Sequence, residues 1–348
     1  MSQTDKNNDV SLAAEALGHG VKCSVLERGA PPLFIEAVDG AFPTLERTLE
    51  WVKENRETLD RLILEQGAIV LRGFPLVTAE HFNSLVDLFP AYERGYVGGG
   101  SPRAVVTGKV LEATQLAGSV KITQHSEMAY MRDYPPRIAF FGRLPAKTGG
   151  ETTIASMREV TARLDPQLRS KLEQHGVRGV RNFAAPRTSS SVVRDNADNK
   201  GWDVVFGTDS RAEVEELCKQ TGMEPVWNPD GSLTLIGYTD AFSRHPVTGE
   251  LFYRSIIHTN YLTYENLPDG QDRKQALLRA GKLPTGYALG NGDELEREES
   301  RKLENIIEDA VVAWPWKAGD VMILDNLQVS HGRNPFTGER DTLVALLG

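Results

Sequence analysis

The sequence predicts a fold made mostly of β-strands with flanking helices, whose core is a double-stranded β-helix of the jelly-roll type. Short runs of β-favouring residues, split by glycine and proline turns, recur along most of the chain. Helical segments interrupt these runs without the regular alternation that a parallel βαβ sheet requires. No shift in composition marks a domain boundary, so one large antiparallel domain is expected.

The expected helices follow from apolar spacing and from residues that cap helix ends. Three segments have apolar residues at helical spacing, namely residues 43–66, 78–89 and 294–313. Ser156 with Glu159, and Ser210 with Glu213, have the spacing of a capping box. Asp165 precedes a proline, and this pair can begin a helix. These signals predict helices between and outside the strands.

The expected strands are short and surround these helices. They are residues 68–71, 104–110, 120–124, 137–143, 152–155, 179–183, 202–206, 233–236, 321–324 and 342–347. Two polar segments, residues 187–201 and 266–292, lack such a pattern, and we expect them to be lid loops. Residues 1–20 are expected to form a flexible tail, so that residues 21–348 make a single domain.

Composition narrows the class of protein. The 348 residues carry 39 Lys and Arg against 48 Asp and Glu, so the net charge of −9 disfavours nucleic acid or an anionic membrane as partner. The two cysteines, Cys23 and Cys218, cannot form a disulfide framework and suit a reducing compartment. No apolar run approaches the ~18 residues of a membrane span, and the first ten residues lack the pattern of a secretory signal. We therefore expect a soluble cytoplasmic protein.

One triplet of residues points to a metal. Of the seven histidines, only His125 is followed two positions later by a carboxylate, Glu127. The triplet ends the predicted strand 120–124, and residues i and i+2 of a strand share a face. His331, beyond the predicted strand 321–324, is the third candidate. Two imidazoles and one carboxylate leave three metal positions open, which is the facial arrangement of non-haem Fe(II) oxygenases.

Other interpretations of these residues stay open at this point. One His-x-carboxylate triplet per chain is about what chance gives at this frequency of acidic residues. His125 and Glu127 could be a polar pair at the end of a surface strand, and His331 a loop histidine. A serine hydrolase has less support, because the chain contains no Gly-x-Ser-x-Gly elbow.

Several motifs in a fixed order add to the triplet. They lie at residues 96–103, 125–130, 136–142, 145–152, 181–183 and 331–340. With these motifs the chain resembles the taurine-dioxygenase-like (TauD/TfdA) superfamily of Fe(II)/2-oxoglutarate-dependent oxygenases, whose core is a cupin-like jelly roll. Within it, the chain is most similar to the SyrP-like aspartyl hydroxylase branch found in natural-product pathways. The likeness covers residues 69–347.

The resemblance implies an iron site and names its ligands. His125, Glu127 and His331 match the residues that bind Fe(II) in the family, and 2-oxoglutarate and O₂ would take the open positions. Ser126 stands where relatives often have asparagine, but that position is not a ligand. Because Glu127 is present, the chain does not match the halogenating relatives, which lose this carboxylate so that chloride can bind the iron.

The resemblance also implies how the co-substrate is held. Thr152 matches a threonine that hydrogen-bonds 2-oxoglutarate in the family. Arg340 matches the arginine whose planar fork can bind the far carboxylate of 2-oxoglutarate through two hydrogen bonds. Relatives often have a second basic residue after this arginine, where this chain has Asp341. Arg333 therefore stays an alternative to Arg340.

The implied activity is oxidation of an unactivated C–H bond in an amino acid or an amino-acid-derived substrate, free or carried as a thioester, with hydroxylation the usual outcome. Arg103 and Arg181 are candidates for binding a substrate carboxylate, although a solvated arginine is the ordinary interpretation of each. The same centre could instead catalyse desaturation, epoxidation or cyclisation. A jelly-roll binding protein without catalytic activity is a further alternative.

Overall fold

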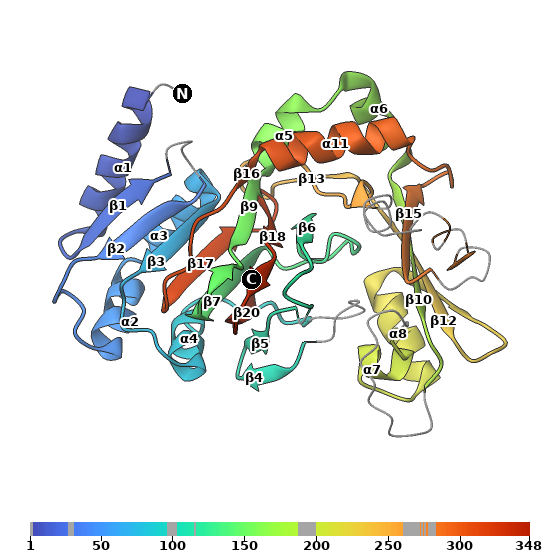
Figure 1. Cartoon of the computed structure of the whole chain (residues 1–348), viewed down its shortest axis with the longest axis horizontal. Coiled ribbons are helices and arrows are strands. Elements are labelled where there is room, and N and C mark those ends of the chain that lie inside the picture. Colours follow the sequence, from blue (N-terminus) through green and yellow to red (C-terminus); the bar gives the residue numbers. More distant parts are fainter. Residues whose placement is uncertain are drawn as a thin grey trace.

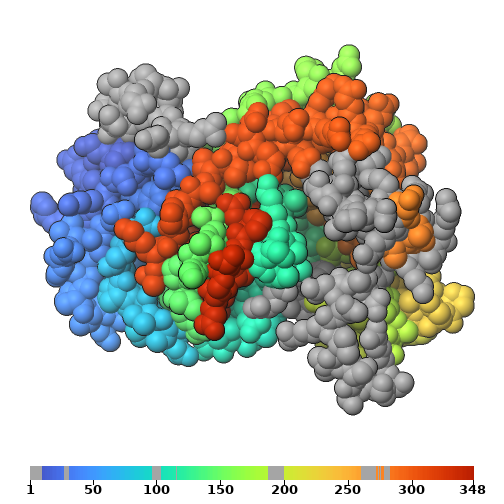
Figure 2. All heavy atoms as spheres, in the orientation of Figure 1, coloured from blue at the N-terminus to red at the C-terminus, as the bar shows by residue number. Residues whose placement is uncertain are grey.

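A computed structural model of the chain describes residues 3–26, 31–95, 103–114, 116–186, 200–259, 272, 274, 276–277 and 283–348. Among these residues, helices and several β-sheets combine into a mixed α and β structure (Figure 1). In the space-filling view, the red C-terminal segment lies at the centre of the face, below the orange helix α11 (Arg297–Asp309) (Figure 2). No helix in the described part of the chain is both long and apolar enough to cross a membrane.

The largest sheet forms the central layer. Its eight strands follow the order β1 (Val21–Val25), β2 (Leu33–Ala37), β3 (Ala68–Arg72), β17 (Asp320–Asp325), β7 (Arg137–Leu144), β20 (Asp341–Leu347), β5 (Val110–Glu112) and β4 (Val105–Thr107). β2 and β3 are parallel, and the other neighbouring pairs are antiparallel. Every residue of β17 is buried, because both faces of the sheet are covered at this strand.

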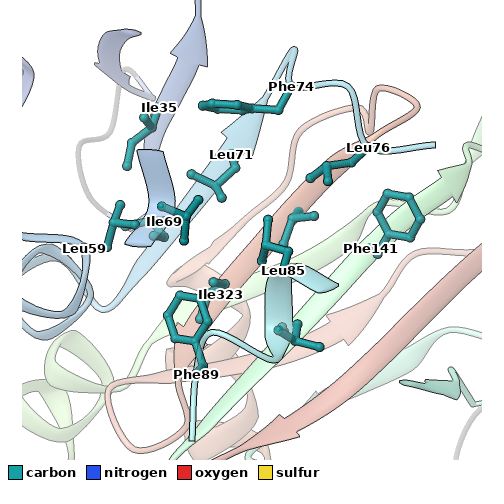
Figure 3. Packing of buried hydrophobic residues seen from close by; sticks show 14 of the residues in the cluster. Ile35, Leu59, Ile69, Leu71, Phe74, Leu76, Leu85, Phe89, Phe141 and Ile323 are labelled. Carbon is teal, nitrogen blue, oxygen red and sulfur yellow. The ribbon is translucent and has the colours of Figure 1, made fainter. Parts of the chain in front are cut away.

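Three helices cover one face of this sheet, namely α2 (Leu45–Glu54), α3 (Arg56–Gln66) and α4 (Ala79–Val86). Their apolar side chains and those of the sheet form one buried cluster, part of which Figure 3 shows. Ile69 and Ile323 come from the sheet, Leu59 from α3 and Leu85 from α4. The helical spacing that predicts these helices is therefore the spacing of residues that bury one stripe against the sheet.

The opposite face of the large sheet packs against a second sheet of four strands. These strands are ordered β16 (Val311–Val312), β9 (Thr152–Ser156), β18 (Val329–Arg333) and β6 (Ile122–His125). Ile154 and Val329 of this sheet share a buried cluster with Phe140 and Met322 of the large sheet. The smaller sheet carries most of the candidate metal ligands. The jelly-roll closure of the two sheets stays a prediction.

A third sheet lies to one side of these layers (Figure 1). Its order is β11 (Met223–Trp227), β12 (Leu233–Thr239), β10 (Val177–Phe183) and β15 (Thr285–Leu289). Other elements in the described part of the chain are two strand pairs and four helices. The pairs are β13 (Phe242–Arg244) with β14 (Leu251–Tyr253) and β8 (Thr148–Gly149) with β19 (Phe336–Thr337), and the helices are α5 (Met157–Arg163), α6 (Pro166–His175), α7 (Trp202–Phe206) and α8 (Arg211–Thr221).

The predicted helix starts are confirmed where a side chain caps the helix. Ser156 and Ser210 accept hydrogen bonds from the backbone N–H groups of Glu159 and Glu213, at 3.3 Å in each case. Asp165 accepts from two N–H groups of α6 at 3.0 Å. Each cap satisfies a donor that the first turn of a helix leaves without a partner.

Two predictions, one at the start of the chain and one for a late helix, need correction. Residues 3–17 form helix α1 (Gln3–Leu17) instead of a flexible tail, and Ala13 and Leu17 are buried in the main core. Val10, Ala13 and Leu17 have helical spacing, but the pattern is short and follows a run of polar residues from 3 to 9. The predicted helix 294–313 is shorter at both ends, because α11 begins at Arg297 and stops at Asp309. Val311–Val312 then forms strand β16, which pairs with β9.

Predictions in the middle of the chain also need correction. Residues 202–206 form helix α7, not a strand, and a five-residue apolar run cannot distinguish the two. Residues 43–66 form two helices that meet at Asn55. Part of the predicted loop 266–292 is strand β15, and most of residues 266–282 lie outside the described residues. The predicted lid at 187–201 also lies outside them, apart from its last two residues.

Candidate metal centre

Three of the predicted residues converge in space. His125 ends β6 and His331 lies within β18, and the two are direct partners across these antiparallel strands. Their ring centroids are 4.4 Å apart. Glu127 follows β6, and its Oε2 lies 3.7 Å from His331 Nε2. One donor atom from each residue lies within 4.8 Å of the other two. The three residues that the sequence analysis singles out therefore lie close enough together to be candidate ligands of one metal ion.

Each histidine can offer a ring nitrogen to a metal. Thr123 O lies 2.9 Å from His125 Nδ1, so Nδ1–H can donate to it and leave Nε2 with a free lone pair. Burial, with a smaller contribution from the neighbouring His125 and Arg103 side chains, holds the pKa of His331 well below its usual value. In the described part of the chain, the buried His331 Nδ1 has no hydrogen-bond partner. A neutral, buried imidazole beside a carboxylate fits a metal ligand.

Arg103 contacts the carboxylate of this cluster. Its Nη2 donates to Glu127 Oε2 at 2.8 Å, and both side chains are buried, with exposed fractions of 5% and 3%. A buried carboxylate is stable only when it is paired or bound to a metal. The positive charge of the Arg103 guanidinium stabilises one carboxylate oxygen of Glu127. A divalent cation bound by Glu127 and the two imidazoles would stabilise the carboxylate further. The donor set, two neutral imidazoles and one carboxylate, is the one that suits Fe(II).

The predicted co-substrate residues lie beside the histidines. His125, His331, Thr152 and Arg340 all line one small cavity of about 40 Å³, which also touches Arg103. Arg340 Nε donates to Gly150 O at 2.8 Å, and its Nη2 donates to Thr152 Oγ1 at 3.4 Å. Burial lowers the pKa of Arg340 to about 10, so the group is still a cation at neutral pH. A buried cation next to the histidines is suited to an anionic co-substrate.

The other two arginines have different surroundings. Arg333 also lines the cavity, but it donates to the carbonyl oxygens of Leu116, Ala117 and Val120 at 2.8–3.2 Å. Arg181, on β10, stacks on the ring of Tyr130 with its Cζ 3.4 Å from the ring centroid. It is not among the residues that line the cavity. Of the two predicted substrate arginines, the structure thus brings Arg103 to the metal cluster and leaves Arg181 outside the cavity wall.

Sequence reasoning missed polar residues that support the site. Gln124 is a buried residue of β6, next to His125, and its side chain bonds to the neighbouring strands of the sheet. Its Nε2 donates to Thr153 Oγ1 at 2.6 Å and its Oε1 accepts from Ser330 Oγ at 3.1 Å. Trp316 Nε1 donates to Thr152 Oγ1 at 3.2 Å. Alternation along a strand places Gln124 and Ser330 on the face opposite the ligands. This alternation was the only sequence signal for Gln124 and Ser330, and it does not show that the face of the sheet opposite the ligands is also buried.

Comparison with known proteins gives a consistent result. The family model described as "Taurine catabolism dioxygenase TauD, TfdA family" matches residues 35–347. The dapdiamide synthesis protein DdaC of Enterobacter agglomerans is 28% identical over 334 residues, which cover 95% of each chain. A clavaminate synthase-like protein of Arabidopsis thaliana is 31% identical over 299 residues, covering 85% of this chain and 86% of the relative.

Solved structures support the fold. PvcB of Pseudomonas aeruginosa, described as an Fe, alpha-ketoglutarate dependent oxygenase, aligns with a TM-score of 0.51 at 16% identity, covering 94% of this chain and 92% of PvcB. AAD-2, solved with Mn(II) and N-oxalylglycine, aligns with a TM-score of 0.50 at 14% identity, and the alignment covers 94% of this chain and 96% of AAD-2. Because the family model spans most of the sequence and the ligand cluster is in place, the chain belongs to the TauD/TfdA family of Fe(II)- and 2-oxoglutarate-dependent oxygenases.

Proposed function

We propose that this oxygenase acts on an unactivated C–H bond of an amino acid or an amino-acid-derived substrate, free or bound to a carrier as a thioester, in natural-product biosynthesis. Hydroxylation is the proposed outcome. The observation that carries the oxidation chemistry is the convergence of His125, Glu127 and His331. The substrate class is supported by the SyrP-like motifs and by the likeness to a protein named for dapdiamide synthesis.

We assign His125, Glu127 and His331 as the ligands of Fe(II). When bound, the metal supplies the oxidising power, as 2-oxoglutarate and O₂ are converted to succinate and CO₂ and one oxygen atom enters the substrate. The three residues supply two neutral donors and one negative charge. This donor set would hold the metal and leave coordination positions for the co-substrate and O₂.

We assign Arg340 and Thr152 to the far carboxylate of 2-oxoglutarate. Both line the cavity beside the histidines, and the guanidinium already donates toward the threonine hydroxyl. Arg333 has less support for this role, because its N–H groups already serve three backbone carbonyls. Apolar walls complete the site. The ring of Phe140 lies 5.1 Å from that of His331 and helps to exclude water there.

Arg103 and Arg181 are the proposed cations for a substrate carboxylate. Arg103 has the stronger support, because it lines the cavity and reaches the carboxylate of Glu127. Arg181 stacks on Tyr130, three residues after that ligand, and so approaches the same segment from β10. An amino acid or its derivative can supply an anionic group to the buried Arg103 and the half-buried Arg181.

The same centre can also support desaturation, epoxidation or cyclisation, since these reactions differ only in the fate of the substrate after hydrogen removal. A binding protein without catalytic activity has less support, because it would need neither a complete ligand set nor the Arg340 and Thr152 pair. The test is anaerobic reconstitution with Fe(II) and 2-oxoglutarate, followed by O₂ and a panel of amino acids and acyl thioesters. Substrate-dependent succinate release with a product that gains one oxygen atom supports the proposal. Coupled turnover only with non-amino-acid substrates would contradict it.

A further inference from the structure

The three metal ligands are fixed to the fold in different ways. His125 and His331 lie in strands, where backbone pairing sets their separation. Glu127 lies in a turn just beyond β6, outside the backbone ladder of the sheet. The next residue, Met128, has φ of +55°, a left-handed conformation that costs energy for a residue with a side chain. Other groups must therefore hold the carboxylate ligand in place.

Asn326 holds the backbone of Glu127 directly. Its Oδ1 accepts from the Glu127 N–H at 2.7 Å, and its Nδ2 donates to the Glu127 carbonyl at 3.0 Å. The same Nδ2 donates to Pro135 O at 2.9 Å, and the residue is fully buried. One side-chain amide thus replaces the strand neighbour that the turn lacks. Both backbone polar groups of the ligand residue depend on it.

Arg254 holds the turn on the other side of the ligand. Its Nη2 donates to the carbonyl oxygens of Met128 and Met131, each at 2.8 Å. Its guanidinium lies over the ring of Tyr134, with Cζ 3.5 Å from the centroid, and the residue is 3% exposed. These two hydrogen bonds tie the strained residue to the end of its own turn, which offsets the cost of the left-handed conformation.

The turn that carries Asn326 is itself anchored. Asp325 Oδ1 accepts from the N–H groups of Leu327 and Gln328, both at 3.0 Å, and its Oδ2 lies 2.9 Å from His245 Nε2. The N–H of Asn326 donates to Pro136 O at 2.9 Å. The position of the Asn326 amide is therefore determined before any ligand binds.

We propose that Asn326 and Arg254 are positioning residues that aim the Glu127 carboxylate at the metal. The inference rests on the proposed function only in taking His125, Glu127 and His331 as ligands of one metal. It predicts that metal affinity and coordination geometry depend on hydrogen bonds to the backbone around Glu127, although neither residue touches the metal.

The test measures Co(II) binding by titration of its visible absorption in anaerobic, metal-free protein. Asn326→Asp keeps the size of the side chain but turns an oxygen toward two carbonyl oxygens. We expect it to weaken Co(II) binding at least tenfold and to change the shape of the Co(II) bands. Asn182→Asp is the matched control, because Asn182 Nδ2 also donates to a backbone carbonyl, Leu283 O, but in the third sheet. It should leave the affinity within about twofold.

A double-mutant cycle separates positioning of Glu127 from general damage to the fold. In a Glu127→Ala background, adding Asn326→Asp should change Co(II) affinity by less than about twofold, because its target is already gone. Arg254→Lys is the second variant and decides the question if Asn326→Asp does not fold. Arg254→Lys keeps the positive charge but loses the planar guanidinium that donates to Met128 O and Met131 O, so it should also weaken Co(II) binding. Unchanged affinity and bands in a folded single variant, or an equal loss in both backgrounds, would overturn the proposal. Failure of the wild-type protein to bind Co(II) would instead contradict the assigned metal site.

Discussion

His125 and His331 are direct partners across strands β6 and β18, with their ring centroids 4.4 Å apart, although they lie far apart in the sequence. The backbone pairing of β6 and β18 places the two imidazoles next to each other. Buried Gln124 bridges the same region through Thr153 and Ser330 on the other face. The preorganised pair can therefore be tested one residue at a time.

Replacement of His125 should abolish metal-dependent binding of the co-substrate. His125→Ala removes one of the two imidazole donors, so the visible charge-transfer band of the protein with Fe(II) and 2-oxoglutarate should disappear under anaerobic conditions. Circular dichroism should stay unchanged. His175→Ala, at the end of α6, is the matched control and should keep the band. A full band in His125→Ala would remove this residue from the metal.

Arg340 and Arg333 should respond differently to the same substitution. Arg340→Ala should weaken 2-oxoglutarate binding at least tenfold, because a hydrogen bond to a charged group contributes ~1.5–3 kcal/mol. Titration of the charge-transfer band with 2-oxoglutarate measures this affinity. Arg333→Ala should instead lower the free energy of unfolding, because three backbone carbonyls lose their donor. If Arg333→Ala alone weakens 2-oxoglutarate binding, the carboxylate site belongs to Arg333.

Acid should destabilise the metal-free protein partly through His258. Burial lowers the pKa of this histidine from 6.5 to about 4, so between these values the unfolded chain binds a proton that the folded protein does not. The stabilisation is complete above pH 6.5 and is lost as the pH falls toward 4. His331 acts in the same direction.

The measurement is urea unfolding with a chelator at pH about 7 and about 5, where titration of the buried groups differs. The loss of unfolding free energy on acidification should be smaller in His258→Gln than in the wild type, by on the order of 1–3 kcal/mol. Glutamine can keep a hydrogen bond to the Tyr253 hydroxyl, which lies 3.3 Å from His258 Nδ1. Equal losses in the two proteins would show that His258 does not contribute.

Gln124 should stabilise the sheet that carries the histidines. Gln124→Met has a similar volume but leaves the buried Thr153 and Ser330 hydroxyls without this partner, so the free energy of unfolding should fall by ~1–3 kcal/mol. Gln220→Met, on the exposed side of α8, should change it by less than ~0.5 kcal/mol. Urea unfolding of the metal-free variants measures both values. A near-zero effect at Gln124 would mean that the network carries no net stability.

The sequence predicts the metal cluster and many central elements for identifiable reasons. The strand pattern marks His125, and the adjacent Glu127 joins it from the turn that follows β6, where strand alternation no longer applies. Capping residues such as Ser156 mark helix starts. The sequence does not reveal that Asn326 bonds the backbone of Glu127, since a turn residue has no periodic pattern. Nor does it reveal that residues 202–206 are helical, because so short an apolar run fits either period.

The most direct test of the metal centre is a crystal structure of the protein grown with Mn(II), with the metal located by anomalous scattering. We expect one strong peak within ~2.0–2.3 Å of a nitrogen of His125, a nitrogen of His331 and a carboxylate oxygen of Glu127. A peak bound elsewhere, or a metal-free cluster whose three side chains point apart, would contradict the central claim.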